Sequence, residues 1–275
     1  GIGSEVKIFL AAPLTEKLIR LAFDEQLTEA DEVHWDEREE SVIARKITRL
    51  GSLELSVIPL STSSEKITTA MLDGIRLLGL DALPWTKDAH SIRMRNEWLR
   101  ANNLTKSLLP NLSDDELLET LEDWLAPYLT GITRRVHLQK LDMSMIVRAM
   151  FSFERLRELE LLAPTHLTVP TGSHIPLDYS SGEQPVLAVR LQEMFGETDT
   201  PTVAGGKVKV LLHLLSPAHR PLAITQDLPS FWKNAYPDVR KDMRGRYPKH
   251  YWPENPLEAE PTRRTVKRNI PNDHR

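Results

Sequence analysis

Residues 211–256 read LLHLLSPAHRPLAITQDLPSFWKNAYPDVRKDMRGRYPKHYWPENP and form the most informative stretch of the chain. Apolar residues at its start predict a strand over residues 208–213, and two short helices are predicted at residues 229–235 and 237–244. Between residues 231 and 252, six Lys or Arg stand against two Asp, with Trp and Tyr interleaved among them. Cations neutralise phosphates and flat rings stack on unpaired bases, so this pattern is typical of a surface that binds single-stranded nucleic acid.

The candidate nucleic-acid-binding residues occupy the last predicted helix and the irregular segment after it. Another interpretation makes Phe231 and Trp232 simply the apolar face of a helix. The cations of the next helix lie on its polar side, and Gly245, Pro248 and Pro253 predict an exposed, irregular segment around the remaining candidates. The candidates are Arg240, Lys241, Arg244, Arg246, Tyr247, Lys249, His250, Tyr251 and Trp252.

Upstream of this stretch, the hydrophobic period changes twice. Alternating residues predict short strands after Pro164, and a helical period precedes them for about a hundred residues. Nearer the start, alternation with turns between the apolar runs predicts an antiparallel meander. The predicted strands are 7–11, 33–35, 41–47, 53–58, 166–169, 174–177, 186–190 and 208–213, and the predicted helices are 15–23, 64–78, 90–101, 114–128 and two across 141–163.

These elements predict an α+β fold, with short antiparallel strands, a helical subdomain and a C-terminal helical segment. We predict a β-rich segment at residues 5–62, a helical subdomain at 63–163 and a strand-rich, then helical domain at 164–256. A Pro-rich, charged tail is predicted to be poorly ordered over residues 257–275. The two groups of strands could together build an oligonucleotide-binding (OB)-like barrel around the helical insertion.

Composition excludes several kinds of function. The 275 residues contain no cysteine, which excludes disulfides and thiolate metal sites and fits a cytoplasmic protein. No apolar run approaches the roughly 20 residues of a membrane helix, so no membrane partner is expected. The net charge of −4 means that nucleic-acid binding must depend on local basic regions.

Catalytic motifs are missing from the sequence. It contains no GxxxxGK[ST] phosphate loop and no Asp-Glu-Ala-His box, so this chain alone is expected to hydrolyse no ATP. The histidines are scattered without metal-ligand spacing, and the acids at 36–40 and 114–116 suit a hairpin turn and a helix cap. We therefore expect no catalytic residue, no metal site and no cofactor in this chain.

The segments 214–232 and 236–253 closely resemble the C-terminal signature of HrpB-type bacterial DEAH-box helicases. The resemblance extends to LAPYLTG at 125–131, APTHLTVPTG at 163–172, LQEMFG at 191–196 and the Trp35 hairpin. It implies a parent protein that is an ATP-dependent 3′ to 5′ RNA helicase of the bacterial cytoplasm. ATP and magnesium would bind that protein's two RecA-like motor domains, which precede these elements in the family.

Two functions follow as expectations. In the first, the chain binds single-stranded RNA and guides it for the motor domains of the same parent chain. In the second, it is a protein interaction module that docks a partner or the helicase core without contacting RNA, because Arg and Trp are equally suited to protein interfaces.

Overall fold

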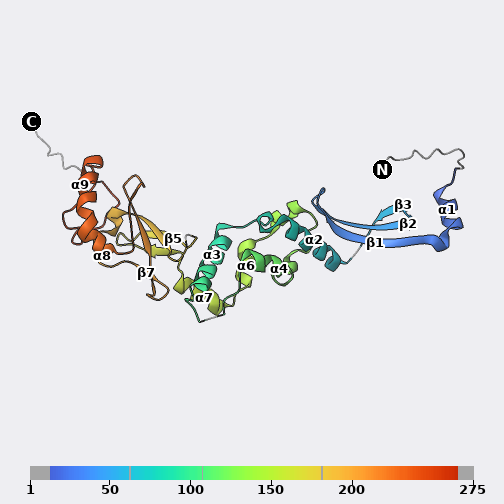
Figure 1. Cartoon of the computed structure of the whole chain (residues 1–275), viewed down its shortest axis with the longest axis horizontal. Helices are drawn as coiled ribbons and strands as arrows, with labels where there is room; N and C mark the ends of the chain where they lie inside the picture. The colour runs from blue at the N-terminus through green and yellow to red at the C-terminus, as the bar shows by residue number, and fades with distance from the viewer. Residues whose placement is uncertain (1–12, 62, 107, 181, 266–275) are drawn as a thin grey trace, which may run out of the picture. The chain divides into compact units, whose positions relative to one another are not determined.

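The computed structural model describes residues 13–61, 63–106, 108–180 and 182–265 (Figure 1). The chain divides into two compact units, which we call the first unit (Gly1–Pro84 with Leu118–Asp142) and the second unit (Trp85–Leu117 with Met143–Arg275). Each unit thus combines segments that are far apart in the sequence. The predicted strand at residues 7–11 lies outside the described residues.

An antiparallel meander forms the sheet of the first unit, as the alternating pattern predicts. Its strands are β1 (Leu27–Asp36), β2 (Ser41–Leu50) and β3 (Leu53–Pro59), in the order β1-β2-β3. Gly51, with a φ of 58°, makes the tight turn that pairs Leu50 with Leu53. The guanidinium groups of Arg49 and Arg45 donate to Glu32 across the strands and hold the pKa of that carboxyl below its usual value.

Helix α2 (Ser64–Leu78) packs on this sheet. Its N-terminus is capped by Ser63, whose hydroxyl accepts from the N–H of Lys66 at 3.5 Å. Gly74 on the helix faces the indole of Trp35 on β1, which is buried. Because glycine has no side chain, α2 can approach the sheet closely at position 74.

The remaining elements of the first unit are short. They are α1 (Glu16–Ala22), α5 (Leu121–Trp124) and the 3₁₀ turns at Asp24–Gln26, Leu80–Ala82, Ala126–Tyr128 and Arg135–Lys140. The prediction of one helix over residues 114–128 is wrong, because α4 (Asp114–Glu119) ends before Thr120 and α5 begins after it. Thr120 has φ −103° and ψ 25°, outside the helical region, and Pro127 has no N–H to extend α5.

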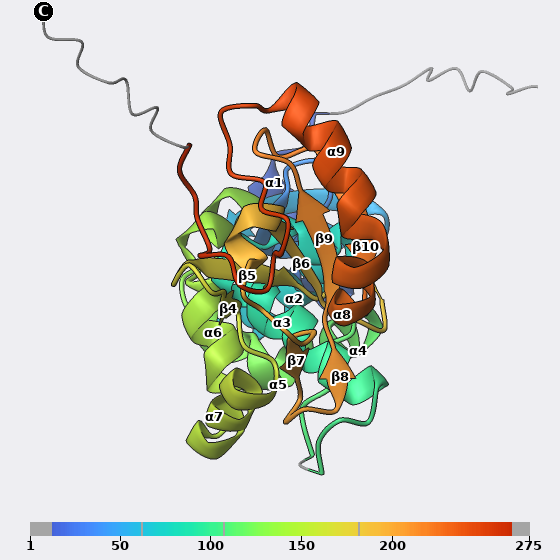
Figure 2. The same ribbon diagram turned by 90° about the vertical axis from the view of Figure 1, so that its left-hand side faces the viewer.

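The second unit is built on a five-stranded sheet with the order β10-β9-β6-β5-β4 (Figure 2). β6 and β9 run parallel and the other neighbours are antiparallel. The strands are β4 (His166–Thr168), β5 (His174–Asp178), β6 (Val186–Arg190), β9 (Leu211–Leu215) and β10 (Pro221–Thr225), with β7 (Thr202–Val203) and β8 (Val208–Lys209) as a separate two-stranded hairpin.

The α+β fold class is confirmed, but no closed barrel forms among the described residues. Among the named strands the meander β1-β2-β3 pairs only within itself, with one further bridge from Ser41 to Arg134. The five-stranded sheet ends on the unjoined edges β10 and β4. An OB-like barrel requires a sheet that closes on itself. The two groups of strands instead serve two different units.

In the second unit, helix α3 (Lys87–Ala101) contacts α6 (Met143–Ala149) and α7 (Phe153–Leu162). Arg95 of α3 is almost fully buried, and it donates to the carbonyl of Ala163 at 3.0 Å and to Glu160 at 2.9 Å. Its Nε also donates to the carbonyl of Ser91 at 3.3 Å, and these hydrogen bonds together with the Glu160 charge make the buried guanidinium tolerable. This contact ties α3 to the end of α7.

Residues 257–265 are the described part of the tail predicted at 257–275 and belong to the second unit, whereas residues 266–275 lie outside the described residues. Ala259 is buried, and the N–H of Thr262 donates to the carbonyl of Gln192 at 2.9 Å. Gly196 in turn donates its N–H to the carbonyl of Pro256. These backbone contacts hold a segment that has no helix or strand of its own.

Candidate nucleic-acid interface

The candidate residues lie on a helical region interrupted by a wide turn. It comprises α8 (Leu228–Ser230), a π-helical turn (Phe231–Ala235) and α9 (Tyr236–Arg246). Asp227 caps the start by accepting from the N–H of Ser230 at 2.9 Å. Pro237 has no N–H and so cannot donate to the carbonyl four residues before it, as an α-helix requires. The N–H of Tyr236 instead donates to the carbonyl of Phe231, five residues before it, which is the π-helical pattern.

The aromatic residues of this region mostly face the interior. Phe195, Phe231, Trp232, Tyr236 and Trp252 are all buried. The ring of Phe195 lies 6.1 Å from those of Trp232 and Tyr236, with the second contact edge-on. Burial raises the pKa of the Tyr236 hydroxyl. The interpretation of Phe231 and Trp232 as core residues is confirmed.

Trp252 and Arg240 hold the chain as it returns from α9, along residues 247–256, which we call the return segment. The indole N–H of Trp252 donates to the carbonyl of Tyr247 at 3.1 Å. Arg240 donates from Nε to the carbonyl of Trp252 at 3.0 Å and from Nη2 to Glu254. The prediction that Trp252 stacks on a base is therefore wrong, because its ring is buried. The guanidinium of Arg240 already donates to groups within the chain.

His250 is half-buried, and its ring lies edge-on to that of Tyr247 at 6.1 Å between centroids. Burial and the nearby positive charge of Arg190 lower the pKa of His250 below its usual value. The lowered pKa disfavours the charged form of the ring, and the role of His250 in binding nucleic acid stays a prediction.

Four of the predicted cations remain exposed. In the part of the chain that the structure describes, Lys241, Arg244 and Lys249 form no ion pair, whereas Arg246 pairs with Asp242 at 3.0 Å. Lys241 and Arg244 are three residues apart on α9 and so lie on one helix face. Cations near a helix C-terminus also interact favourably with the helix dipole, which alone could account for Arg244 and Arg246.

Only one ring of the predicted set is substantially open to solvent. Tyr251 is 41% exposed, Tyr247 is half-buried and Trp252 is buried. The ring of Tyr251 also contacts Phe195 edge-on at 6.2 Å between centroids. The site is thus a group of exposed cations with a single accessible ring, which differs from the predicted track of alternating rings and charges.

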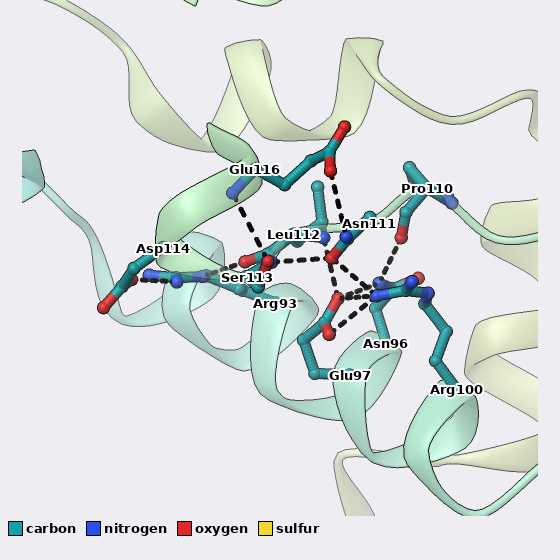
Figure 3. Close-up of polar contacts among 10 residues, drawn as sticks. All are labelled: Arg93, Asn96, Glu97, Arg100, Pro110, Asn111, Leu112, Ser113, Asp114 and Glu116. Atoms are coloured by element: carbon teal, nitrogen blue, oxygen red, sulfur yellow. Dashed lines mark hydrogen bonds and ion pairs between the residues drawn. The ribbon is translucent and has the colours of Figure 1, made fainter. Parts of the chain in front are cut away.

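A polar cluster on α3 was missed by the sequence prediction (Figure 3). The carboxylate of Glu97 accepts from the backbone N–H of Leu112 at 2.7 Å and from the guanidinium of Arg100, which also donates to Asn111. Arg93 donates to the carbonyl of Leu112 at 2.6 Å and pairs with Asp114. The side chains of this polar cluster form hydrogen bonds with one another and with the backbone of the loop at residues 110–114. The cluster therefore fixes that loop on α3 and does not offer an open binding site.

A buried carboxylate in the 3₁₀ turn Leu191–Met194, which follows β6, was also missed. Glu193 is 3% exposed and accepts hydrogen bonds from the hydroxyls of Ser173 at 2.6 Å and Thr171 at 3.0 Å. Arg190 lies 3.4 Å away and balances its charge. Sequence gives only a weak signal here, because these residues are about twenty positions apart.

Searches for other kinds of site give negative findings for the described residues. They contain no group of three or more His, Asp or Glu placed to hold a metal ion. None of their helices is long and apolar enough to span a membrane.

Comparison with known proteins decides the family. Residues 124–256 match the model of an ATP-dependent helicase C-terminal region, and residues 26–60 match the connector region of the ATP-dependent RNA helicase HrpB. The chain is 43% identical over 244 residues to the ATP-dependent RNA helicase HrpB of Escherichia coli strain K12. The chain belongs to the HrpB helicase family.

Solved HrpB structures agree with this assignment. A crystal structure of the E. coli DExH-box NTPase HrpB matches 91% of the chain with a TM-score of 0.71 at 42% identity. A crystal structure of the E. coli DEAH/RHA helicase HrpB matches 82% with a TM-score of 0.61 at 41% identity. The sequence match covers 87% of this chain but only 30% of the curated E. coli HrpB. The two structure matches cover 31% and 29% of the solved chains, so this chain spans about a third of the length of its relatives.

Proposed function

We propose that this chain is an accessory region of an ATP-dependent RNA helicase that binds single-stranded RNA and guides it for the motor domains of the same protein. The observation that carries the proposal is the group of exposed cations Lys241, Arg244, Arg246 and Lys249, which we call the α9 cation group. Three of them have no ion-pair partner among the described residues. Exposed cations at the end of a helix and in the segment after it are suited to phosphate oxygens.

The geometry favours backbone contacts over base stacking. Burial of Trp252 and Trp232 removes two large rings from the surface, and among the candidate residues Tyr251 has the most exposed ring. Binding should therefore depend strongly on salt and weakly on sequence, as for other phosphate-directed surfaces.

Catalysis of ATP hydrolysis is proposed to belong to the rest of the helicase. This sequence has no phosphate-binding loop and no Asp-Glu-Ala-His box, so ATP and magnesium would bind elsewhere in the complete protein. We expect this chain alone to show no ATPase activity. Its lack of cysteine and the RNA named in the E. coli relative's description fit a bacterial cytoplasmic role.

The alternative, that the basic aromatic segment docks a protein, has less support. Protein interfaces are usually anchored by accessible aromatic residues at their centre. Here the rings of Phe231, Trp232 and Trp252 already pack inside the second unit, and mostly charged groups remain outside.

Charge reversal of Arg244 and Lys249 to Glu tests the proposal by fluorescence anisotropy with a labelled single-stranded RNA. Each phosphate contact contributes about −0.7 to the slope of log K against log salt for single strands, so four cations give a slope of about −2.8. Affinity should fall about 50-fold between 50 and 200 mM salt for the unchanged chain. Removing two contacts halves the slope, and the corresponding fall is about sevenfold.

A matched control is the double substitution Lys207→Glu with Lys209→Glu, which changes the net charge equally at two exposed residues of the same unit. It should leave the slope near the unchanged value. Equal effects of both doubles, or no effect of Arg244→Glu with Lys249→Glu, would refute the α9 cation group as the binding site.

A further inference from the structure

A pocket of about 420 Å³ lies in the second unit, between the return segment and the chain that follows it. We call it the Tyr251 pocket. Its volume falls within the range of sites that hold small ligands or parts of larger ones. The residues that line it include Tyr251, Glu258, Glu260, Thr262 and Arg264.

One wall of the Tyr251 pocket is fixed at both ends by backbone hydrogen bonds. The N–H of Gly196 donates to the carbonyl of Pro256 at 2.9 Å, and the N–H of Thr262 donates to the carbonyl of Gln192 at 2.9 Å. Gly196 has a φ of 82°, which glycine adopts without strain. Between the two bonds, Ala259 is buried against the unit. The pocket is therefore preformed by the fold.

The pocket combines an accessible ring with free carboxylates. Tyr251 is 41% exposed, and Glu258 and Glu260 are also exposed. Within the described residues neither carboxylate forms an ion pair or a hydrogen bond, so both can accept from a ligand. A phosphate in the pocket would face two negative charges. A neutral, planar group with N–H donors fits better, because the ring can stack on its face and a carboxylate can accept from its edge.

A strand bound to the α9 cation group can reach this pocket. Lys249 stands two residues before Tyr251, and two residues span at most about 7 Å. A strand whose phosphate binds Lys249 can thus place a neighbouring base against Tyr251. Arg264 is exposed, lines the pocket and has no ion-pair partner in the part of the chain that the structure describes, so it offers a further phosphate contact.

We propose that the Tyr251 pocket binds one unpaired base of the RNA and prefers a base with an amino group on its Watson–Crick edge. Cytosine presents an amino donor where uracil presents a carbonyl oxygen. Glu258 or Glu260 can accept from the amino group, whereas a carbonyl oxygen would face a carboxylate with no proton between them. This inference rests on the proposed RNA binding and adds a base preference to it.

The test compares oligomers of cytidine and of uridine, each of about 12 nucleotides, on the 275-residue chain by fluorescence anisotropy at low salt. The unchanged chain should bind the cytidine oligomer about fivefold more tightly, as expected for one additional hydrogen bond. Glu258→Gln with Glu260→Gln should remove the preference, because an amide can donate to the uracil oxygen as well as accept from cytosine. Tyr251→Ala should weaken both oligomers about tenfold.

The matched control is Glu154→Gln with Glu183→Gln, which changes the net charge equally at two exposed glutamates of the second unit outside the pocket. It should keep the fivefold preference. Equal affinities of the unchanged chain for both oligomers, or a preference that survives Glu258→Gln with Glu260→Gln, would overturn the base pocket.

Failure of the pocket is distinguishable from failure of the proposed function. Arg244→Glu with Lys249→Glu should weaken both oligomers and preserve their ratio, since neither residue lines the pocket. Salt-dependent binding without a base preference would reject the pocket and leave the α9 cation group in place. Absence of binding to either oligomer would reject the proposed function, and the base pocket with it.

Discussion

Substitution of Gly74 by Ala should destabilise the first unit, because the indole of Trp35 occupies the space of the new methyl group. A Cβ at this position would lie 2.5 Å from Cε3 and 2.8 Å from Cε2 of the ring. Carbon atoms in favourable contact are about 3.5–4.0 Å apart, so helix or ring must move by about 1 Å. Trp35 is 8% exposed, and a move of its ring disturbs the surrounding core.

The expected change in the free energy of unfolding of Gly74→Ala combines two opposite effects. Overpacking a core costs about 1–3 kcal/mol, and three ring atoms in close approach place this site at the upper end. Alanine in a helix interior gains about 1 kcal/mol over glycine. The net loss in the free energy of unfolding should be about 2 kcal/mol, measured by urea denaturation with far-UV circular dichroism.

Gly245→Ala is the matched control, because Gly245 is also helical and its added Cβ would meet nothing within 4 Å. It should stabilise the chain by about 0.5 kcal/mol. Combining Gly74→Ala with Trp35→Phe should recover part of the lost free energy of unfolding, because the smaller ring leaves room for the new methyl group. Removing the indole breaks no hydrogen bond, since its N–H has no partner among described residues. Strictly additive effects in this double variant, or an unchanged Gly74→Ala, would refute the close-packing argument.

The remaining predictions separate structural from binding roles in the second unit. Trp252→Ala should lower the free energy of unfolding by about 3–5 kcal/mol in chemical denaturation, because the ring is buried. Tyr251→Ala should weaken RNA binding in anisotropy with a smaller loss of stability, and the reverse ranking would restore Trp252 as a stacking residue. The lowered pKa of His250 means that the unfolded chain binds more protons, so stability should fall as pH drops from its unfolded pKa of about 6.5 towards the lowered folded pKa. His250→Gln should reduce that fall in pH-dependent melting, and an unchanged profile would contradict the burial argument.

The sequence predicts local structure well wherever one physical signal dominates. Helix α2 and strand β6 have the predicted bounds, since hydrophobic periodicity and caps agree there. Strand β10 was missed although it pairs with the preceding strand β9, because it starts with Pro221 and its register shifts between Pro221 and Ala223. The proposed barrel was wrong because no local pattern tells which strands share a sheet, and the units here combine remote segments.

The candidate site shows a second limit of sequence. A basic stretch with Trp and Tyr is equally consistent with an RNA-binding surface and with a buried aromatic core. Only the burial of the rings in the structure distinguishes the two. Lys241, Arg244 and Lys249 are exposed as predicted, but Trp252 turned inward. The pattern of residue types was therefore informative about the cations and misleading about the rings.

The hydrogen bonds of the buried rings explain why this stretch uses Trp and Tyr rather than Phe. The return segment has no helix or strand, so its carbonyls lack ladder partners and would be costly to bury unpaired. Tyr236 donates to the carbonyl of Pro253 at 2.8 Å, Trp252 to that of Tyr247, and Arg240 to that of Trp252. These side-chain donors provide the hydrogen bonds that a neighbouring strand would otherwise supply, and they hold the return segment against α9. Because the frame is fixed in this way, the exposed cations beside it are held on a rigid backbone, and binding a phosphate chain should cost the entropy of their side chains but little entropy of the backbone.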